Sequence, residues 1–313
     1  MDDPADPTQR LYRPGSVTWK VNRETVLLLG GGRALLMQLA HPLVAAGVAE
    51  HSDFQRRPLD RLARTLELTL SMVFGTREEA VVAARRINQA HRTVQGTLSD
   101  GSGGVAAGAP YSARNPDLLL WVHATLVESA VLTYESLVEA LTDREKQEYL
   151  LESRLVGELL GIPREAFAAD WSCFRAYLER MYAGPVRVSD QARRLARGVL
   201  DPGLPLVPRA AYAPTNLITT GLLPASLRDG YRLPWGRARR AAYATSLRVI
   251  PALVRGAPAR LRQMSAYRVA SRTPAGQARM SSPGEARTRP KRRGAHRPRA
   301  GDPARPRRAS PPP

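Results

Sequence analysis

The chain of 313 residues is 43% hydrophobic, which is enough for a packed core, and its formal net charge is +19. Residues 272–313 carry +10 of this charge and residues 228–271 carry +9, so residues 1–227 are neutral overall. The single cysteine, Cys173, excludes an intrachain disulfide and any zinc or iron–sulfur site built from cysteines.

The start of the chain predicts an extension that precedes the folded part. Residues 1–16 are acidic and then interrupted by proline and glycine, and they lack the apolar run of a signal peptide. We therefore assign residues 1–19 to an N-terminal extension and expect a cytoplasmic protein. The longest apolar stretch, residues 34–49, is too short and too polar to predict a transmembrane segment.

Apolar residues recur with the period of an α-helix along most of the chain. In chain order, helices are predicted over residues 24–29, 33–48, 58–74, 76–98, 115–141, 142–160, 163–182, 189–199, 210–222, 236–254 and 259–271. No stretch alternates with a period of two over a length that would suggest a sheet. We therefore predict an all-α fold, with a single multi-helix domain over residues 20–271.

Several boundaries are marked by residues with specific local roles. Thr76 and Thr142 are predicted N-caps, and Glu145 follows Thr142 at the spacing of a capping box. The run from Gly30 to Gly32 lacks the strand and the lysine of a phosphate-binding loop, so it predicts a sharp bend between close-packed helices. Residues 99–110 are rich in glycine and predict a loop.

The last part of the chain, residues 272–313, loses its apolar residues and consists mainly of Arg, Pro, Ala, Gly and Ser. Such a segment buries too little surface to offset the entropy of ordering, so we predict a disordered basic tail. Its arginines are not interleaved with aromatic residues. This pattern predicts weak, salt-sensitive attraction to acidic surfaces and no specific nucleic-acid recognition.

One histidine stands on an apolar stripe formed by Ile87, His91, Val94 and Leu98 at helical spacing. A lone histidine in this setting is commonly a core residue whose ring bonds to a backbone carbonyl. The alternative is a haem ligand, because haem iron binds a neutral imidazole nitrogen whose partner nitrogen is held by an acceptor. Both interpretations are compatible with the stripe.

A basic and polar cluster lies on the preceding predicted helix. Arg61 and Thr65 share a face with Leu68 and Met72, and Arg64 lies one residue off that face. One interpretation is a solvated edge, with the arginine stems along the core. The other is a buried cluster that faces the His91 helix and binds a haem propionate through charge-assisted hydrogen bonds.

The remaining histidines of the neutral part are less specific. His41 precedes Pro42 and His123 lies among apolar residues, so each alone is read as structural, although three such histidines favour a metal or haem site. His51 follows Glu50 in a polar turn and is predicted to be exposed. Glu-x-x-His and His-Glu-x-x-His do not occur, which argues against ferritin-like di-iron and common zinc-protease sites.

Several segments, in their order and spacing, resemble the haem-oxygenase superfamily of latex clearing protein (rubber oxygenase) and the mpaB-type oxygenases. The matching segments are Gly-Gly-Gly-Arg-Ala-Leu-Leu-Met-Gln-Leu-Ala-His-Pro (30–42), Arg-Leu-Ala-Arg-Thr (61–65), Val-Phe-Gly-Thr (73–76), Asn-Gln-Ala-His-Arg-Thr-Val-Gln-Gly (88–96), Tyr-Ser-Ala-Arg-Asn-Pro-Asp-Leu-Leu-Leu-Trp-Val-His-Ala-Thr (111–125) and Gly-Leu-Leu-Pro (221–224). The resemblance covers residues 20–265, and it rests on the whole set of segments.

The resemblance implies an all-α fold with a globin-like core that holds haem b, and it implies that His91 is the proximal iron ligand. The family's Arg-x-x-Lys-Thr element near the haem matches Arg61 to Thr65, with Arg64 in place of the lysine. A guanidinium stays charged, so Arg64 is not expected to ligate iron, but it can donate to a propionate or a bound oxygen species. We place no residue at the position of the family's catalytic glutamate.

These observations predict a haem b-dependent oxygenase that uses dioxygen on a small apolar, olefinic or isoprenoid-like substrate. His91, Arg61, Arg64 and Thr65 are the expected cofactor-binding residues, with His91 as the iron ligand and with Arg64 and Thr65 as the catalytic candidates. The alternative is a helical protein that binds haem without catalysis, such as a sensor.

Overall fold

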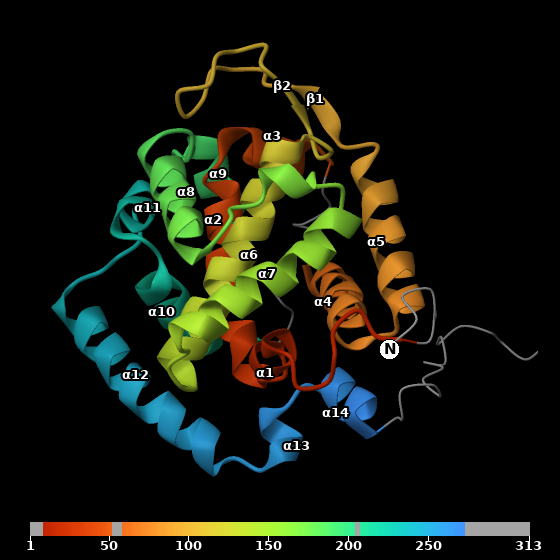
Figure 1. Ribbon diagram of the computed structural model, residues 1–313. Coiled ribbons are helices and arrows are strands. Elements are labelled where there is room, and N and C mark those ends of the chain that lie inside the picture. The colour runs from red at the N-terminus through yellow and green to blue at the C-terminus, as the bar shows by residue number, and fades with distance from the viewer. Residues whose placement is uncertain (1–8, 52–57, 204–206, 273–313) are drawn as a thin grey trace, which may run out of the picture. The chain divides into compact units, whose positions relative to one another are not determined.

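The computed structural model of the chain describes residues 9–51, 58–203 and 207–272, and within residues 58–62 it describes the backbone alone. The described residues belong to one compact unit (Figure 1). The predicted disordered tail lies outside the described residues from residue 273 onward.

The described residues are mostly helical, which confirms the predicted all-α class. The α-helices are α1 Val17–Asn22, α2 Gly31–Leu39, α3 Pro42–His51, α4 Pro58–Phe74, α5 Arg77–His91, α6 Pro116–Leu137, α7 Asp143–Leu159, α8 Trp171–Ala183, α9 Asp190–Leu200, α10 Ala213–Leu222, α11 Ala225–Gly230, α12 Arg237–Gly256, α13 Ala259–Arg262 and α14 Ser265–Arg272. The 3-10 helices are η1 Thr25–Gly30, η2 Arg164–Ala166 and η3 Arg209–Tyr212. Strands β1 Gln95–Thr97 and β2 Pro110–Ser112 form a short antiparallel hairpin.

The predicted caps at Thr76 and Thr142 are confirmed. The Thr76 hydroxyl accepts from the backbone N–H of Glu79 at 3.2 Å, and the Glu79 carboxylate accepts from the N–H of Thr76 at 2.8 Å. Thr142 and Glu145 form the same reciprocal pair. Each capping box satisfies N–H groups that have no partner within the helix, and so fixes where α5 and α7 begin.

The chain bends sharply where one helix was predicted over residues 33–48. Helices η1 and α2 on one side and α3 on the other meet at an angle of 104°. The prediction of one helix was wrong because Pro42 has no N–H to continue a helix and disfavours helical backbone at the residue before it. No single described helix is long and apolar enough to cross a membrane, although this bent pair passes that test by length and composition.

Helix α6 is the centre of the core and contacts η1, α1, α2, α7 and α12 (Figure 1). The glycines at the start of α2 let it pack closely, as predicted. The sharp bend predicted at these glycines is wrong, since Gly30 and Gly31 keep helical backbone angles and the bend lies before Pro42. A Cβ atom on Gly30 would overlap the Thr133 hydroxyl of α6, and one on Gly32 would lie 2.5 Å from the Thr219 hydroxyl of α10. The glycine run therefore serves backbone packing between three core elements.

Helix α5 ends at His91, although the sequence predicted a helix to about Leu98. Val94 lies in the turn after the helix, and Leu98 follows β1 and is buried against Tyr111. Gly96 and the β-branched residues around it disfavour helical backbone, and the pairing of β1 with β2 satisfies the backbone instead. The apolar stripe is therefore helical only as far as His91.

Candidate functional site

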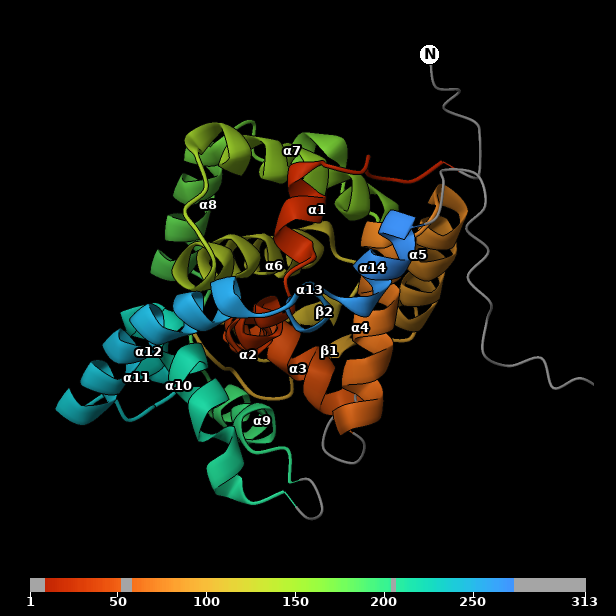
Figure 2. The ribbon, with the colours of Figure 1, turned by 90° about the horizontal axis from the view of Figure 1, so that it is seen from below.

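Helices α4 and α5 run side by side as an antiparallel hairpin with a two-residue connection (Figure 2). They pack through small and apolar side chains, since Met72 of α4 is buried in one cluster with three alanines of α5. Leu68 and Ile87 extend this contact away from the connection. The open end of the hairpin therefore lies at the start of α4 and the end of α5.

This geometry brings two sequence-predicted sites to the same end of the hairpin. Because a helix rises about 1.5 Å per residue, Arg61 lies about 20 Å before the end of α4 and His91 about 21 Å after the start of α5. Arg64 and Thr65 lie about one turn closer to the connection. The side chain of Arg61 lies outside the described part of the chain.

The exposure of the α4 cluster fits the first of its two interpretations, a solvated edge, and not the second, a buried cluster. Arg64 and Thr65 are exposed, Leu68 is half-buried and Met72 is buried. The expectation of a buried cluster is wrong for Arg64 and Thr65, because the elements that pack on α4 cover its second half. There, Val73 and Phe74 pack with α1 and α14. Both candidate side chains can thus be reached by a ligand.

His91 is half-buried at the C-terminus of α5. Burial lowers the pKa of the His91 imidazole below its usual range, so the ring is neutral near pH 7. Among the described residues, its ring nitrogens form no hydrogen bond. A neutral imidazole is the form that binds a metal or a haem iron.

His123 and His41 are both buried, and their environments differ. The Nε2 atom of His123 lies 3.0 Å from the Ser153 carbonyl oxygen, and its ring packs edge-on against Phe167, so His123 is a satisfied core histidine. His41 lies at the bend between α2 and α3, and burial lowers its pKa to about 4. Within the described residues, its Nδ1 atom is buried and has no hydrogen-bond partner.

A polar cluster that sequence reasoning missed lies where α3 meets the β-hairpin. The Tyr111 hydroxyl donates to the Glu50 carboxylate, and His51 Nε2 lies 3.1 Å from the Gln95 carbonyl oxygen and 3.2 Å from the Tyr111 hydroxyl. Burial and the Glu50 carboxylate raise the pKa of Tyr111 to about 12, so the hydroxyl remains a donor. His51 is exposed, as predicted.

This cluster adjoins the end of α5. Val94, three residues after His91, lies against Gly47 of α3, which also contacts Tyr111. The only sequence signal was the Glu50-His51 pair at the end of an apolar stretch. Its partners are 44 to 61 residues away along the chain, so no local pattern could identify them.

A second missed group is buried in the core, between α2, α6, α8 and α10. Arg33 of α2 is 1% exposed and donates to the Glu128 carboxylate at 2.9 Å, the Ser129 hydroxyl at 2.7 Å and the Leu222 carbonyl at 2.8 Å. Tyr182 donates to the same carboxylate at 2.7 Å. The sequence offered one signal for this pair, because Arg33 and Glu128 each stand in an otherwise apolar segment. Charged residues in buried segments are generally paired with each other.

No group of three or more His, Cys, Asp or Glu side chains is placed to hold a metal ion in the part of the chain that the structure describes. Haem iron takes its other nitrogen ligands from the porphyrin, so a single protein histidine suffices to attach it. His91 has the neutral ring that such a ligand needs. Within the described residues it lacks the acceptor that ordinarily holds the second ring nitrogen of a metal-bound histidine.

The sequence pattern of a family described as "ER-bound oxygenase mpaB/B'/Rubber oxygenase, catalytic domain" matches residues 19–255. This chain belongs to that family. The match includes α4, α5 and the β-hairpin, so all of the candidate residues lie within the mpaB/rubber oxygenase catalytic domain. Membership confirms the resemblance seen in the sequence and assigns the chain to the oxygenases.

Two relatives share 28% identity with this member of the mpaB/rubber oxygenase family over 222 residues. They are uncharacterized proteins of Mycobacterium bovis and Mycobacterium tuberculosis, and the alignment covers 69% of this chain and 84% of each of theirs. No solved structure matches the chain with statistical significance.

Proposed function

We propose that this protein is a haem b-dependent oxygenase that uses dioxygen on a small apolar substrate, olefinic or isoprenoid-like. His91 is its iron ligand. The observation that carries the proposal is the position of His91, which is half-buried and neutral at the open end of the α4–α5 hairpin, level with Arg61. Membership of an oxygenase family supports the reaction class.

Haem b, when bound, supplies the oxygen chemistry, and the protein supplies attachment, orientation and polarity. His91 offers a neutral ring nitrogen, and its position at the end of α5 keeps the ring at the hairpin's open end. The lowered pKa of His91 favours this role, because a protonated imidazole cannot bind iron.

Arg61, Arg64 and Thr65 are proposed to hold the polar edge of the cofactor. A guanidinium forms paired, charge-assisted hydrogen bonds with a carboxylate, so the arginines suit the haem propionates. A guanidinium is a hydrogen-bond donor without a lone pair to offer a metal, so Arg64 acts as a donor and not as an iron ligand. The exposed Thr65 hydroxyl is a second donor on the same side of α4.

The visible spectrum of the full chain reconstituted with haem b tests the iron ligand. His91→Ala is expected to lose the Soret band of a histidine-ligated haem, because the variant lacks the proposed ligand. His41→Gln and His123→Gln change the two buried histidines outside the proposed site and serve as controls that should retain it. A full, unshifted Soret band in His91→Ala would show that another group holds the iron.

Catalysis is tested separately by oxygen consumption of the haem-loaded chain with apolar alkenes. An oxygenase consumes dioxygen in proportion to the alkene that is oxidised. A haem protein that binds oxygen stably and never turns over would instead support the alternative of a haem-binding sensor. Arg64→Gln is expected to lower turnover while leaving the His91-dependent spectrum in place.

A further inference from the structure

The C-terminal layer, defined as residues 237–272, covers one side of the described unit with helices α12, α13 and α14 (Figures 1 and 2). It contains nine arginines and no aspartate or glutamate. Among the described residues, Arg262 alone of these arginines forms an ion pair, with Glu24 at 3.4 Å. The layer is therefore strongly cationic and carries no acidic residue of its own.

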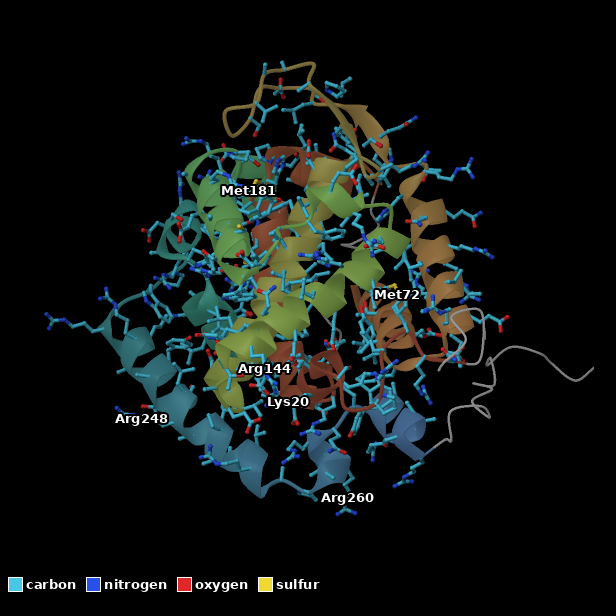
Figure 3. All side chains as sticks on the ribbon, in the orientation of Figure 1. Lys20, Met72, Arg144, Met181, Arg248 and Arg260 are labelled. Atoms are coloured by element: carbon cyan, nitrogen blue, oxygen red, sulfur yellow. The ribbon has the colours of Figure 1, made fainter. Side chains whose placement is uncertain are left out.

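Helix α12 packs on the core through a narrow stripe. Tyr243, Leu247 and Ile250 contact the cluster around Leu137 and Ile218, yet no residue of this helix is buried. Charged side chains occupy its solvent side, and Arg248 and Arg260 of the layer point away from the unit in Figure 3. Seven of the nine arginines are exposed, whereas Arg262 and Arg268 are half-buried.

The same surface exposes large aliphatic side chains. Leu253 of α12 and Leu261 of α13 are each 66% exposed, and Val249 and Leu28 are also exposed. Isolated exposed leucines are ordinary, but here they border one groove between η1 and α12–α13. Its volume is about 440 Å³, and its lining is almost entirely apolar.

The groove has a charged end. A neighbouring cavity of about 280 Å³ shares Val254 and Arg262 with it. Arg23 and Arg255 also line this cavity, together with Glu24 and Glu139. The apolar groove therefore ends in a cavity of mixed charge, where Glu24 pairs with Arg23 at 3.0 Å and with Arg262 at 3.4 Å. The exposed Arg255 and Arg260 are close in sequence to the exposed leucines of the groove. This arrangement matches an amphiphile, in which an apolar chain adjoins an anionic headgroup.

We propose that the C-terminal layer binds the surface of an anionic lipid bilayer. Leu28, Leu253 and Leu261 enter the boundary of the acyl chains, and the arginines contact the headgroup phosphates. A basic helical surface with exposed aliphatic residues is typical of proteins that bind at the membrane interface. Burial of apolar side chains and electrostatic attraction to anionic headgroups both contribute to such binding. Exposed leucines have no use in a complex with nucleic acid, where aromatic residues would stack on bases.

Sedimentation of the full chain with lipid vesicles tests this proposal. The probe is vesicles of phosphatidylglycerol and phosphatidylcholine in equal parts, compared with vesicles of phosphatidylcholine alone. The chain is expected to bind the anionic vesicles and to be released by salt. The double variant Leu253→Glu/Leu261→Glu should lower the partition coefficient by about tenfold or more, because it removes two inserted apolar side chains.

The matched control is Leu151→Glu/Leu155→Glu, which makes the same chemical change on exposed leucines of α7. Both double variants keep residues 273–313, so any contribution of the basic tail is equal in the two. Arg248→Glu is a second test of the surface, with a loss of roughly fivefold or more expected for anionic vesicles.

The proposal is overturned if the Leu253/Leu261 variant binds vesicles as well as the α7 control, or if the chain binds no anionic vesicles. Binding of duplex DNA that is lost in Arg248→Glu, without vesicle binding, would assign the surface to nucleic acid instead. None of these outcomes depends on haem, so they are independent of the test of His91.

Discussion

At the scale of single residues, the buried pair of Arg33 and Glu128 is surrounded by hydrogen-bond partners. Arg33 reaches α6 and α10, and the Glu128 carboxylate that it contacts also accepts from Tyr182 and from Arg175 of α8. Removing two charges from water costs several kcal/mol, and only such complete hydrogen bonding offsets it. The pair therefore fixes four helices to one another.

Glu128→Ala is expected to destabilise the fold by about 3–5 kcal/mol, because it leaves the Arg33 guanidinium buried without its carboxylate. Denaturant unfolding followed by circular dichroism measures the change. Glu158→Ala is the control, since Glu158 pairs with a largely exposed Arg164 and should cost less than about 1 kcal/mol. Equal losses in the two variants would contradict a special role for the buried pair.

At the scale of elements, α2 packs closely on its neighbours because glycine residues at its start have no side chain. Gly32 faces the Thr219 hydroxyl of α10, whereas a Cβ atom on the adjacent Gly31 would meet nothing within 4 Å. Gly31 also has ordinary helical backbone angles, with φ −61°. Gly31 and Gly32 thus have different roles, because a Cβ atom on Gly32 would face α10 and a Cβ atom on Gly31 would face open space.

Gly32→Ala is expected to cost about 1–3 kcal/mol of unfolding free energy, because α2 or Thr219 must shift to admit the methyl group. Gly31→Ala should be neutral or stabilise by up to about 1 kcal/mol, since it lowers the entropy of the unfolded chain. Thermal denaturation compares the two. Adding Thr219→Ala should recover part of the Gly32→Ala loss, and additive effects would count against the proposed contact.

At the scale of the whole molecule, burial of neutral histidines makes stability depend on pH. The pKa of His41, His91 and His123 is lowered in each case, and burial is the largest cause. The unfolded chain therefore binds protons at a higher pH than the folded chain does. Stability is fully present above about pH 6.5 and is lost as the pH falls.

His41 alone accounts for a large part of this dependence. The difference between its pKa of about 4 and the usual 6.5 corresponds to about 3 kcal/mol, lost between these two pH values. Urea unfolding across this range should therefore show stability rising with pH. His41→Gln should flatten the slope, and an unchanged slope would show that His41 does not titrate in this way.

The sequence by itself determined the fold class, the N-caps at Thr76 and Thr142, the bounds of α4 and the family. These features are local, because helical period, a Thr-x-x-Glu cap or a proline acts through neighbours within a few residues. The family is likewise recognised from residue types in their order along the chain. The site assignment stays a prediction for His91, Arg61, Arg64 and Thr65.

Tertiary structure alone decided how these residues are presented. Pairing of β1 with a strand across a glycine-rich loop ended α5 at His91. Packing of α1 and α14 on only part of α4 left Arg64 and Thr65 exposed. The Tyr111 hydroxyl meets Glu50 across 61 residues of chain. Such contacts depend on elements that are distant along the chain, and local sequence patterns do not predict which of these elements a residue will contact.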